Sequence, residues 1–134
     1  MPTPPLPDDL RRMLAEPNPA VMATLRKDGQ PVTVATWYLF EDDRILVNLQ
    51  EDRTRLQHLR TDPRVALTML DAKTWYTHVS VQGHVAEIVD DADLADIDRI
   101  ARHYTGTPFR ARDRKRVSVW IEIDRHHAWQ ARRV

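Results

Sequence analysis

Alternation of apolar and polar side chains predicts most of this chain as β-strand. The two clearest segments are 75–89 and 117–128. Because neighbouring residues of a strand point to opposite faces, each segment presents one apolar face and one polar face. In the first segment one face carries Val79, Val81, Gly83 and Val85, and the other carries His78, Ser80, Gln82 and His84. We expect the apolar face, together with Val119 and Ile121 of the second segment, to form the core.

Four further segments complete the predicted sheet. They are 20–27, 31–40, 44–50 and 64–70. Asp28-Gly29 separates the first two, and this dipeptide is a strong signal for a tight hairpin turn. The segment 31–40 is rich in β-branched and aromatic residues, which favour strands. Consecutive strands joined by short turns indicate antiparallel pairing.

Helical spacing is predicted in three places. The first helix follows the proline-rich arm, with Asp8 or Asp9 as its cap. The second begins near Arg53 and ends before Pro63, because proline cannot continue a helix. The third covers 90–104, where apolar residues recur at helical spacing after an acidic first turn.

Six strands and two or three short helices predict a mainly β fold, a six-stranded antiparallel barrel. Closing the sheet removes its exposed edges. We expect one domain over 1–134, in which 1–19 form an N-terminal arm and a short helix.

Composition narrows the classes of function. The chain has no cysteine and a formal net charge of zero. No apolar run approaches the length of a membrane span, and the N-terminus does not resemble a signal peptide. We therefore expect a cytoplasmic protein with no membrane and no nucleic-acid partner.

Arg53-Thr54-Arg55 is the strongest candidate for chemistry. It lies where a strand ends and a helix begins. Free backbone N–H groups and the helix dipole favour an anion there, and guanidinium groups bind phosphate through paired hydrogen bonds. The alternative is a helix start whose arginines are simply solvated. The basic segment 110–116 is interpreted as a solvated linker, with an anionic tail or nucleic acid as its alternative ligand.

Other chemistries find little support. The chain has only three glycines, and it has neither a glycine-rich phosphate loop nor a Gly-x-Ser-x-Gly elbow. Adjacent His126 and His127 face opposite ways on a strand, and His78 and His84 lie about 20 Å apart at strand rise, so we expect no metal site. This scarcity of nucleophilic side chains is compatible with an enzyme in which a cofactor carries out the reaction.

The order of these features resembles the split-barrel flavin and deazaflavin oxidoreductases related to pyridoxamine 5′-phosphate oxidase. The resemblance covers roughly 18–129 and rests on the order and spacing of several short segments. They are Ala23-Thr-Leu-Arg-Lys-Asp-Gly-Gln-Pro, Thr36-Trp-Tyr, Asp52-Arg-Thr-Arg, Leu59-Arg-Thr-Asp-Pro-Arg-Val and Val81-Gln-Gly-His-Val-Ala-Glu-Ile. The Trp-Tyr pair and the short C-terminus resemble the actinobacterial branch that uses the deazaflavin coenzyme F420.

The resemblance implies a split barrel of the FMN-binding type and a set of cofactor-binding residues. Arg55, helped by Arg53, corresponds to the phosphate-binding position, and arginine replaces the lysine of many relatives. The segment from Val32 to Trp37 corresponds to the strand along the ring system. The implied cofactor-binding residues are Val32, Thr33, Val34, Ala35, Trp37, Asn48, Leu49, Arg53, Arg55 and His78. The resemblance also implies a homodimer with the cofactor at the interface, which Trp75 or Trp129 of the other subunit would reach.

The implied function is hydride transfer between coenzyme F420 and an unsaturated small-molecule substrate. Two alternatives stay open. One is an FMN-dependent oxidase or reductase of the pyridoxamine phosphate oxidase type. The other is a non-catalytic protein that binds a flavin, haem or tetrapyrrole. The sequence assigns no catalytic residue and no substrate, and His78, Tyr38 and water are the candidate proton donors.

Overall fold

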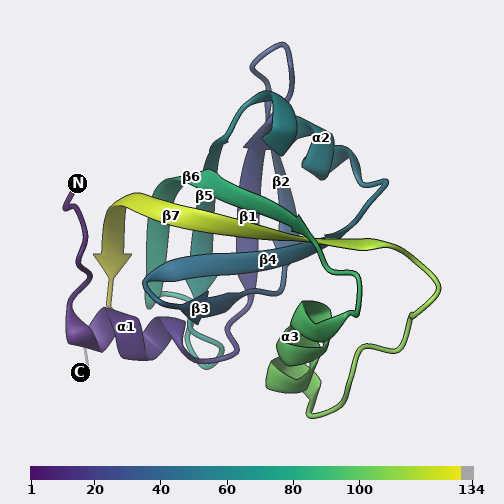
Figure 1. Cartoon of the computed structure of the whole chain (residues 1–134). Coiled ribbons are helices and arrows are strands. Elements are labelled where there is room, and N and C mark those ends of the chain that lie inside the picture. The colour runs from purple at the N-terminus through teal and green to yellow at the C-terminus, as the bar shows by residue number, and fades with distance from the viewer. Residues whose placement is uncertain (131–134) are drawn as a thin grey trace.

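The computed structural model describes residues 1–130 as one antiparallel sheet of seven strands with three helices (Figure 1). In chain order the elements are α1 (Asp8–Leu14), β1 (Ala20–Leu25), β2 (Pro31–Thr36), β3 (Leu39–Glu41), β4 (Arg44–Gln50), α2 (Thr54–Thr61), β5 (Arg64–Leu70), β6 (His78–Asp90), α3 (Ala95–Thr105) and β7 (Arg116–Trp129). The predicted mainly β class, antiparallel pairing and short helices are confirmed. No helix of residues 1–130 is long and apolar enough to cross a membrane.

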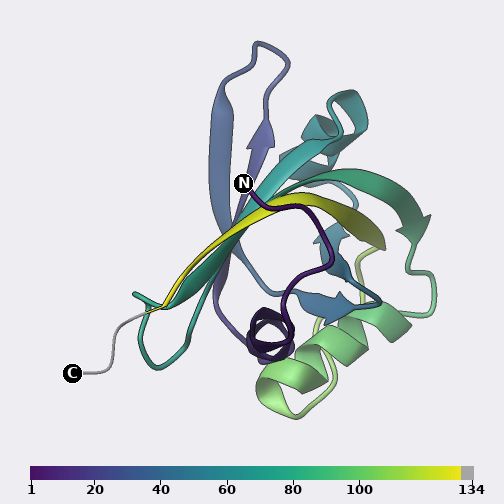
Figure 2. The ribbon, with the colours of Figure 1, turned by 90° about the vertical axis from the view of Figure 1, so that its left-hand side faces the viewer.

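The sheet is open, with the strand order β2-β1-β5-β6-β7-β4-β3. β2 and β3 therefore lie at opposite edges, although Trp37 and Tyr38 alone separate them in the chain. Such a short connection requires the sheet to curl until its two edges approach each other (Figure 2). No ladder joins β2 to β3 within residues 1–130. The prediction of six strands in a closed barrel is therefore wrong in both strand number and closure.

The extra strand arises because the predicted strand 31–40 breaks at Trp37 and Tyr38. The Tyr38 hydroxyl donates to the carbonyl of Leu14 at 2.9 Å and accepts from Nδ2 of Asn18 at 3.0 Å. Tyr38 as a whole is 1% exposed. These contacts draw the tyrosine into the core, so the chain leaves one edge of the sheet and continues at the other. The residues on both sides of the break favour strands, so the alternation of apolar and polar residues does not reveal it.

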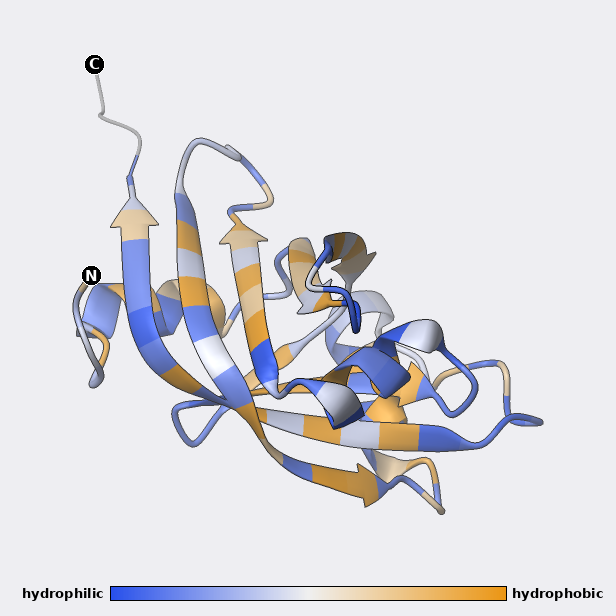
Figure 3. Cartoon of the chain, turned by 90° about the horizontal axis from the view of Figure 1, so that it is seen from above, coloured by the Kyte–Doolittle hydropathy of each residue, from blue (hydrophilic) through white to orange (hydrophobic). Residues whose placement is uncertain are grey.

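The concave side of the sheet holds the main core. Val79, Val81, Val119 and Ile121 are all at most 1% exposed, as the alternation predicts. Val85 is half-buried and packs against this core from its rim. Figure 3 shows the same alternation as bands of apolar and polar colour along the strands.

A second, smaller cluster lies on the outer face of β4, beneath α3. Leu46 packs there against Ile97 and Ile100 of α3, whereas Ile45 and Val47 point into the main core. β4 is therefore covered on both faces. Asn48 shares the outer face of Leu46, two positions further along the strand, and this placement brings it to the site described below.

Three local predictions need correction. Pro7, not Asp8 or Asp9, is the N-cap of α1, and no side chain caps it. β6 begins at His78 rather than at position 75, and its partner β7 extends to Trp129. α3 begins at Ala95, because the preceding residues form a turn that ends with Leu94 in the left-handed conformation.

Candidate functional site

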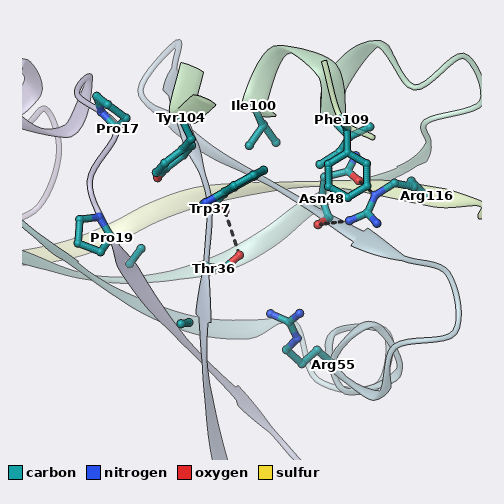
Figure 4. Close-up of a pocket in the computed structure, with 13 residues that line it drawn as sticks. Pro17, Pro19, Thr36, Trp37, Asn48, Arg55, Ile100, Tyr104, Phe109 and Arg116 are labelled. Carbon is teal, nitrogen blue, oxygen red and sulfur yellow. Dashed lines mark hydrogen bonds between the residues drawn. The ribbon is translucent and has the colours of Figure 1, made fainter. Parts of the chain in front are cut away.

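A cavity of about 540 Å³ lies between the sheet and α3, and we call it the α3 cavity (Figure 4). β2, β4, α2, α3 and the start of β7 all contribute to it. It is lined by Pro17, Pro19, Ala20, Ala35, Thr36, Trp37, Asn48, Arg55, Ile97, Ile100, Tyr104, Phe109 and Arg116. None of these residues is acidic, and the two charged ones are arginines. The cavity therefore favours an anion that carries an apolar group.

A second cavity of about 450 Å³, the α2 cavity, lies between β2 and α2. It is lined by Arg26, Val32, Val34, Arg53, Thr54, Arg55 and His58. Again no lining residue is acidic. Arg55 lines both cavities, and β2 runs along both, so a long ligand that follows β2 would pass the Arg55 guanidinium.

The side chain of Arg55 lacks a partner for part of its charge. Its Nη1 is buried and makes no hydrogen bond within residues 1–130. Burial lowers the pKa of Arg55, and the neighbouring charge of Arg53 lowers it further. An unpaired buried donor on a cation costs free energy, because the group has given up water without a replacement. An anion bound at this position would supply the missing acceptor.

Arg116 is a further cation of the α3 cavity, and Asn48 holds it in place. Nε of Arg116 donates to Oδ1 of Asn48 at 2.7 Å, and Nη2 donates to the backbone carbonyl of Asn48 at 3.3 Å. The guanidinium carbon lies 4.7 Å from the centre of the Phe109 ring. Burial lowers the pKa of Arg116, as do the charges of Arg53 and Arg55, while Asp91 acts in the opposite direction. The three arginines thus form one electrostatic cluster.

Asn48 also connects this cluster to α3. Its Nδ2 donates to Oδ2 of Asp91 at 3.0 Å and to Oγ of Ser118 at 3.1 Å. Asp91 is 4% exposed, and its carboxylate accepts from the backbone N–H groups of Asp96 and Ile97 at 3.1 and 2.9 Å. The first turn of α3 is therefore fixed to the end of β4 through a buried polar network.

Three aromatic side chains form the wall of the α3 cavity. The Trp37 ring stacks on Tyr104, with centroids 5.1 Å apart and planes 10° from parallel. Phe109 lies edge-on to Trp37 at 6.5 Å. The Tyr104 hydroxyl donates to the carbonyl of Asn18 at 2.6 Å, and burial raises its pKa to about 12. These contacts fix the orientation of the indole ring, which lines the cavity.

Comparison with known proteins identifies the family. Residues 6–130 match the family model described as Pyridoxamine 5′-phosphate oxidase. The chain belongs to the pyridoxamine 5′-phosphate oxidase family. The resemblance inferred from the sequence is therefore confirmed. The match extends over nearly the whole of the part that the structure describes.

Solved structures of similar fold agree with this family. The chain is similar to an F420 reductase, with a TM-score of 0.83, 23% identity, and coverage of 91% of this chain and 98% of that one. A conserved hypothetical protein from Mycobacterium tuberculosis has a TM-score of 0.73 and 27% identity, and the match covers 95% of this chain and 86% of that one. A putative pyridoxamine 5′-phosphate oxidase from Listeria innocua has a TM-score of 0.68 and 14% identity, and the match covers 90% of this chain and 95% of that one. These likenesses show that the chain shares its fold with these proteins.

Most of the residues implied by the resemblance line the two cavities of this pyridoxamine 5′-phosphate oxidase family member. The α3 cavity includes Ala35, Trp37, Asn48 and Arg55, and the α2 cavity includes Val32, Val34, Arg53 and Arg55. Thr33 is an exposed residue of β2. Leu49 is 1% exposed and packs in the main core, so its side chain is directed away from both cavities.

His78 lies apart from these residues within the protomer. It starts β6, opposite Trp129 of β7, and lines neither cavity. Its Nδ1 lies 3.0 Å from the carbonyl of Tyr76. Any contact between His78 and a ligand in the α3 or α2 cavity would therefore have to come from another subunit.

Sequence reasoning missed the roles of Arg116, Tyr104 and Phe109. Arg116 was assigned to a solvated basic linker, but it is half-buried in the α3 cavity. The proline and glycine after the third helix do not indicate that the chain folds back and brings Phe109 to the α3 cavity. Tyr38, a candidate proton donor, lies in the core, where burial raises its pKa strongly. Its hydroxyl is engaged by Leu14 and Asn18 and is not part of either cavity.

The donor set fits the phosphate of a flavin-type cofactor. The buried, unpaired Nη1 of Arg55 is the observation that tests this fit, because it needs an acceptor. Arg53 stands at the N-cap of α2 and Arg55 in its first turn, so their charges add to the positive end of the helix. No cluster of three or more His, Asp or Glu side chains that could hold a metal occurs in residues 1–130.

Proposed function

We propose that the chain is a reductase that transfers a hydride between coenzyme F420 and an unsaturated small-molecule substrate. The observation that carries this proposal is the unpaired Nη1 of Arg55 between two cavities that have no acidic lining residue. A phosphate accepts several charge-assisted hydrogen bonds at once, so it would satisfy Arg55 and Arg53 together. When bound, the deazaflavin supplies the hydride-carrying ring.

The residues of the chain would bind and orient the cofactor. Arg55 and Arg53 would hold its phosphate. The backbone and side chains of Val32, Val34 and Ala35 would lie along its ring system, since β2 borders both cavities. Asn48 would lie near the ribityl chain that joins the ring to the phosphate. The apolar wall of α3 would exclude water from the reacting face, which favours hydride transfer over side reactions.

FMN is the second candidate cofactor. The family name favours it, because pyridoxamine 5′-phosphate oxidases are flavin enzymes, whereas the structural likeness to an F420 reductase favours the deazaflavin. Both cofactors carry a phosphate that is joined to a planar tricyclic ring through a ribityl chain. The arginine cluster serves either one, so the choice between them requires a direct binding measurement.

We propose further that the chain forms a homodimer with the cofactor at the interface. Trp75 and Tyr76 are 64% and 58% exposed and stack on each other at 4.3 Å, and Trp129 is 56% exposed. Exposed aromatic area of this size commonly marks a contact surface. A second subunit would bury it and would bring His78 within reach of the cofactor of its partner. A cytoplasmic location likewise stays a prediction.

Absorption spectroscopy during titration with each cofactor tests the function. Oxidised deazaflavin absorbs near the violet edge and flavin in the blue, so a change in either band reports which cofactor binds. We expect F420 to bind more tightly than FMN. Failure of both to bind would contradict the proposal.

A second measurement separates catalysis from mere binding. The bound cofactor is reduced anaerobically and then exposed to a set of unsaturated electron acceptors. Reoxidation by at least one acceptor, faster than for free cofactor, is the expected result for a reductase. Rates equal to those of free cofactor for every acceptor would favour the non-catalytic flavin, haem or tetrapyrrole binder instead.

A further inference from the structure

The α3 cavity contains a cation that the proposed cofactor phosphate does not require. Arg53 and Arg55 belong to α2, whereas Arg116 begins β7 and enters the cavity from another side (Figure 4). Asn48 accepts from Nε and Nη2 of Arg116, which leaves the two N–H groups of Nη1 outside that contact. Because Asn48 fixes the guanidinium, an anion bound there loses little free energy to ordering of the side chain.

The surroundings of Arg116 are aromatic rather than acidic. Its guanidinium lies against the Phe109 ring at 4.7 Å, and Phe109 meets Trp37 edge-on. One face of the Trp37 indole is covered by Tyr104, and the residue is still 37% exposed. A planar apolar ring can therefore stack on the uncovered part of Trp37.

These features describe a subsite with two parts, a fixed cation and a flat apolar surface. A neutral ring would offer no acceptor to Nη1 of Arg116, the nitrogen that lies outside the contact with Asn48. A small inorganic anion would leave the aromatic wall exposed to water. A ligand that carries an acidic group on a planar ring satisfies both at once.

We propose that the α3 cavity binds an aromatic or unsaturated organic acid, with its acidic group on Arg116 and its ring against Trp37. The assignment of this acid to the substrate rests on the proposed function, in which Arg53 and Arg55 hold the cofactor phosphate. Asn48 is a positioning residue in this account, because it acts on the ligand through Arg116.

Two fluorescent probes with the same ring system test the subsite without any cofactor. 8-Anilinonaphthalene-1-sulfonate carries one anionic group, and N-phenyl-1-naphthylamine is its neutral counterpart. Each is titrated into wild-type protein, Arg116→Gln, Arg116→Lys and Arg55→Gln. Arg114→Gln is the matched control, because it removes the same charge two residues earlier from a side chain that is exposed and outside the α3 cavity.

We expect Arg116→Gln to weaken binding of the sulfonate about tenfold, the effect of losing one charge-assisted hydrogen bond, and to leave the neutral probe within about twofold. Arg116→Lys should retain part of the affinity, and Arg114→Gln all of it. Equal loss for both probes, a loss confined to Arg55→Gln, or no loss at all would overturn the proposal.

A wild-type experiment covers the case in which Arg116→Gln fails to fold, which near-ultraviolet circular dichroism would reveal. Benzoate and the isosteric neutral benzamide compete with the bound sulfonate. We expect benzoate to displace it at about tenfold lower concentration than benzamide. Equal potency of the two competitors would contradict a cation-centred subsite.

Titrations with FMN and with riboflavin decide whether Arg116 binds the cofactor phosphate or a substrate acid, because these two molecules differ by the phosphate alone. The contrary outcome is that Arg116→Gln weakens the binding of FMN as strongly as it weakens the binding of the sulfonate, without changing the binding of riboflavin. In that case Arg116 binds the cofactor phosphate, and the assignment to a substrate acid is overturned. We expect Arg116→Gln to leave the affinity ratio of FMN to riboflavin unchanged. If neither F420 nor FMN binds at all, the proposed function fails while the probe result stands independently.

Discussion

Arg116 and Asn48 are joined by a 2.7 Å hydrogen bond that connects the start of β7 to the end of β4. The same asparagine binds Asp91, which in turn accepts from the first backbone N–H groups of α3. One side chain thus couples an arginine of the α3 cavity to the helix that covers the cavity. Because Asn48 is 8% exposed, water does not readily replace these bonds.

Asn48→Ala should therefore lower the free energy of unfolding by about 2–3 kcal/mol, since it removes one donor from the buried carboxylate of Asp91 and the side-chain acceptor of the half-buried Arg116 guanidinium. Urea denaturation monitored by tryptophan fluorescence measures the change. Gln50→Ala is the control, because Gln50 lies on the same strand and its side chain donates to Asp52 in an exposed contact. Equal effects of the two substitutions would contradict the structural role given to Asn48.

Gly83 is predicted to tolerate no side chain. A Cβ atom at this position would overlap the backbone carbonyl of Glu122, because β6 and β7 approach closely beside the register shift at Gln82 and Gly83. Gly83→Ala should cost about 1–3 kcal/mol or more, the range for overpacking. Gly29→Ala, in an open turn with φ of +87°, should cost less. Thermal unfolding of both variants gives the comparison, and a larger effect at Gly29 would disagree with it.

His84 should make stability depend on pH. Its Nδ1 lies 3.0 Å from both carboxylate oxygens of Asp124, and this hydrogen bond raises the pKa of the imidazole, with a further contribution from Glu122. A raised folded-state pKa means that the protonated ring stabilises the fold. The contribution is complete below the ordinary value of 6.5 and disappears as the pH rises through the raised value.

The measurement for His84 is the free energy of unfolding of wild type and His84→Asn between pH 5 and pH 9. Because the site is exposed, the difference should be about 1 kcal/mol or less at the acid end. It should fall to zero at the alkaline end. A difference that grows with pH would have the wrong sign for this account.

Light scattering tests the proposed dimer. We expect a mass twice the 15.7 kDa of the chain at micromolar concentration. Replacing Trp75 or Trp129 with serine should shift the equilibrium toward the monomer, because it removes exposed aromatic area from the proposed interface. A wild-type monomer that still binds cofactor would exclude a shared site.

Local patterns were sufficient to predict much of this fold. The segments 44–50 and 64–70 match β4 and β5 residue for residue, because turn residues and Pro63 bound them. The break at Trp37 and Tyr38 was not predictable in the same way. It depends on hydrogen bonds from Tyr38 to residues some twenty positions earlier, which no local preference reports.

The site likewise combines residues that local sequence predicts with residues that depend on distant contacts. Arg53 and Arg55 carried a signal, since charge at a strand end before a helix suggests anion binding. Arg116 carried none, because it ends a run of exposed basic residues. Its burial results from pairing with Asn48, 68 positions earlier. His78 was named by resemblance alone, and it lines neither cavity of the protomer.

The central claim is that Arg53 and Arg55 bind the phosphate of the cofactor. Isothermal titration calorimetry with F420, and in parallel with FMN, tests it on wild type, Arg55→Ala, Arg53→Ala and the double variant. Arg55→Ala should weaken binding by about 1.5–3 kcal/mol, or ten- to a hundredfold, and Arg53→Ala by less. Arg44→Ala, whose guanidinium lies over Trp120 outside both cavities, should leave affinity unchanged.

The double variant gives the most direct answer. Without cofactor, no variant should have a lower thermal midpoint than wild type, because neither arginine takes part in the core and Arg55 carries an unpaired buried donor. We predict that the Arg53→Ala/Arg55→Ala protein binds cofactor at least as weakly as Arg55→Ala, and that added phosphate weakens binding to wild type by competing for the same donors. Equal cofactor affinity of wild type and the double variant would contradict the assignment of the site.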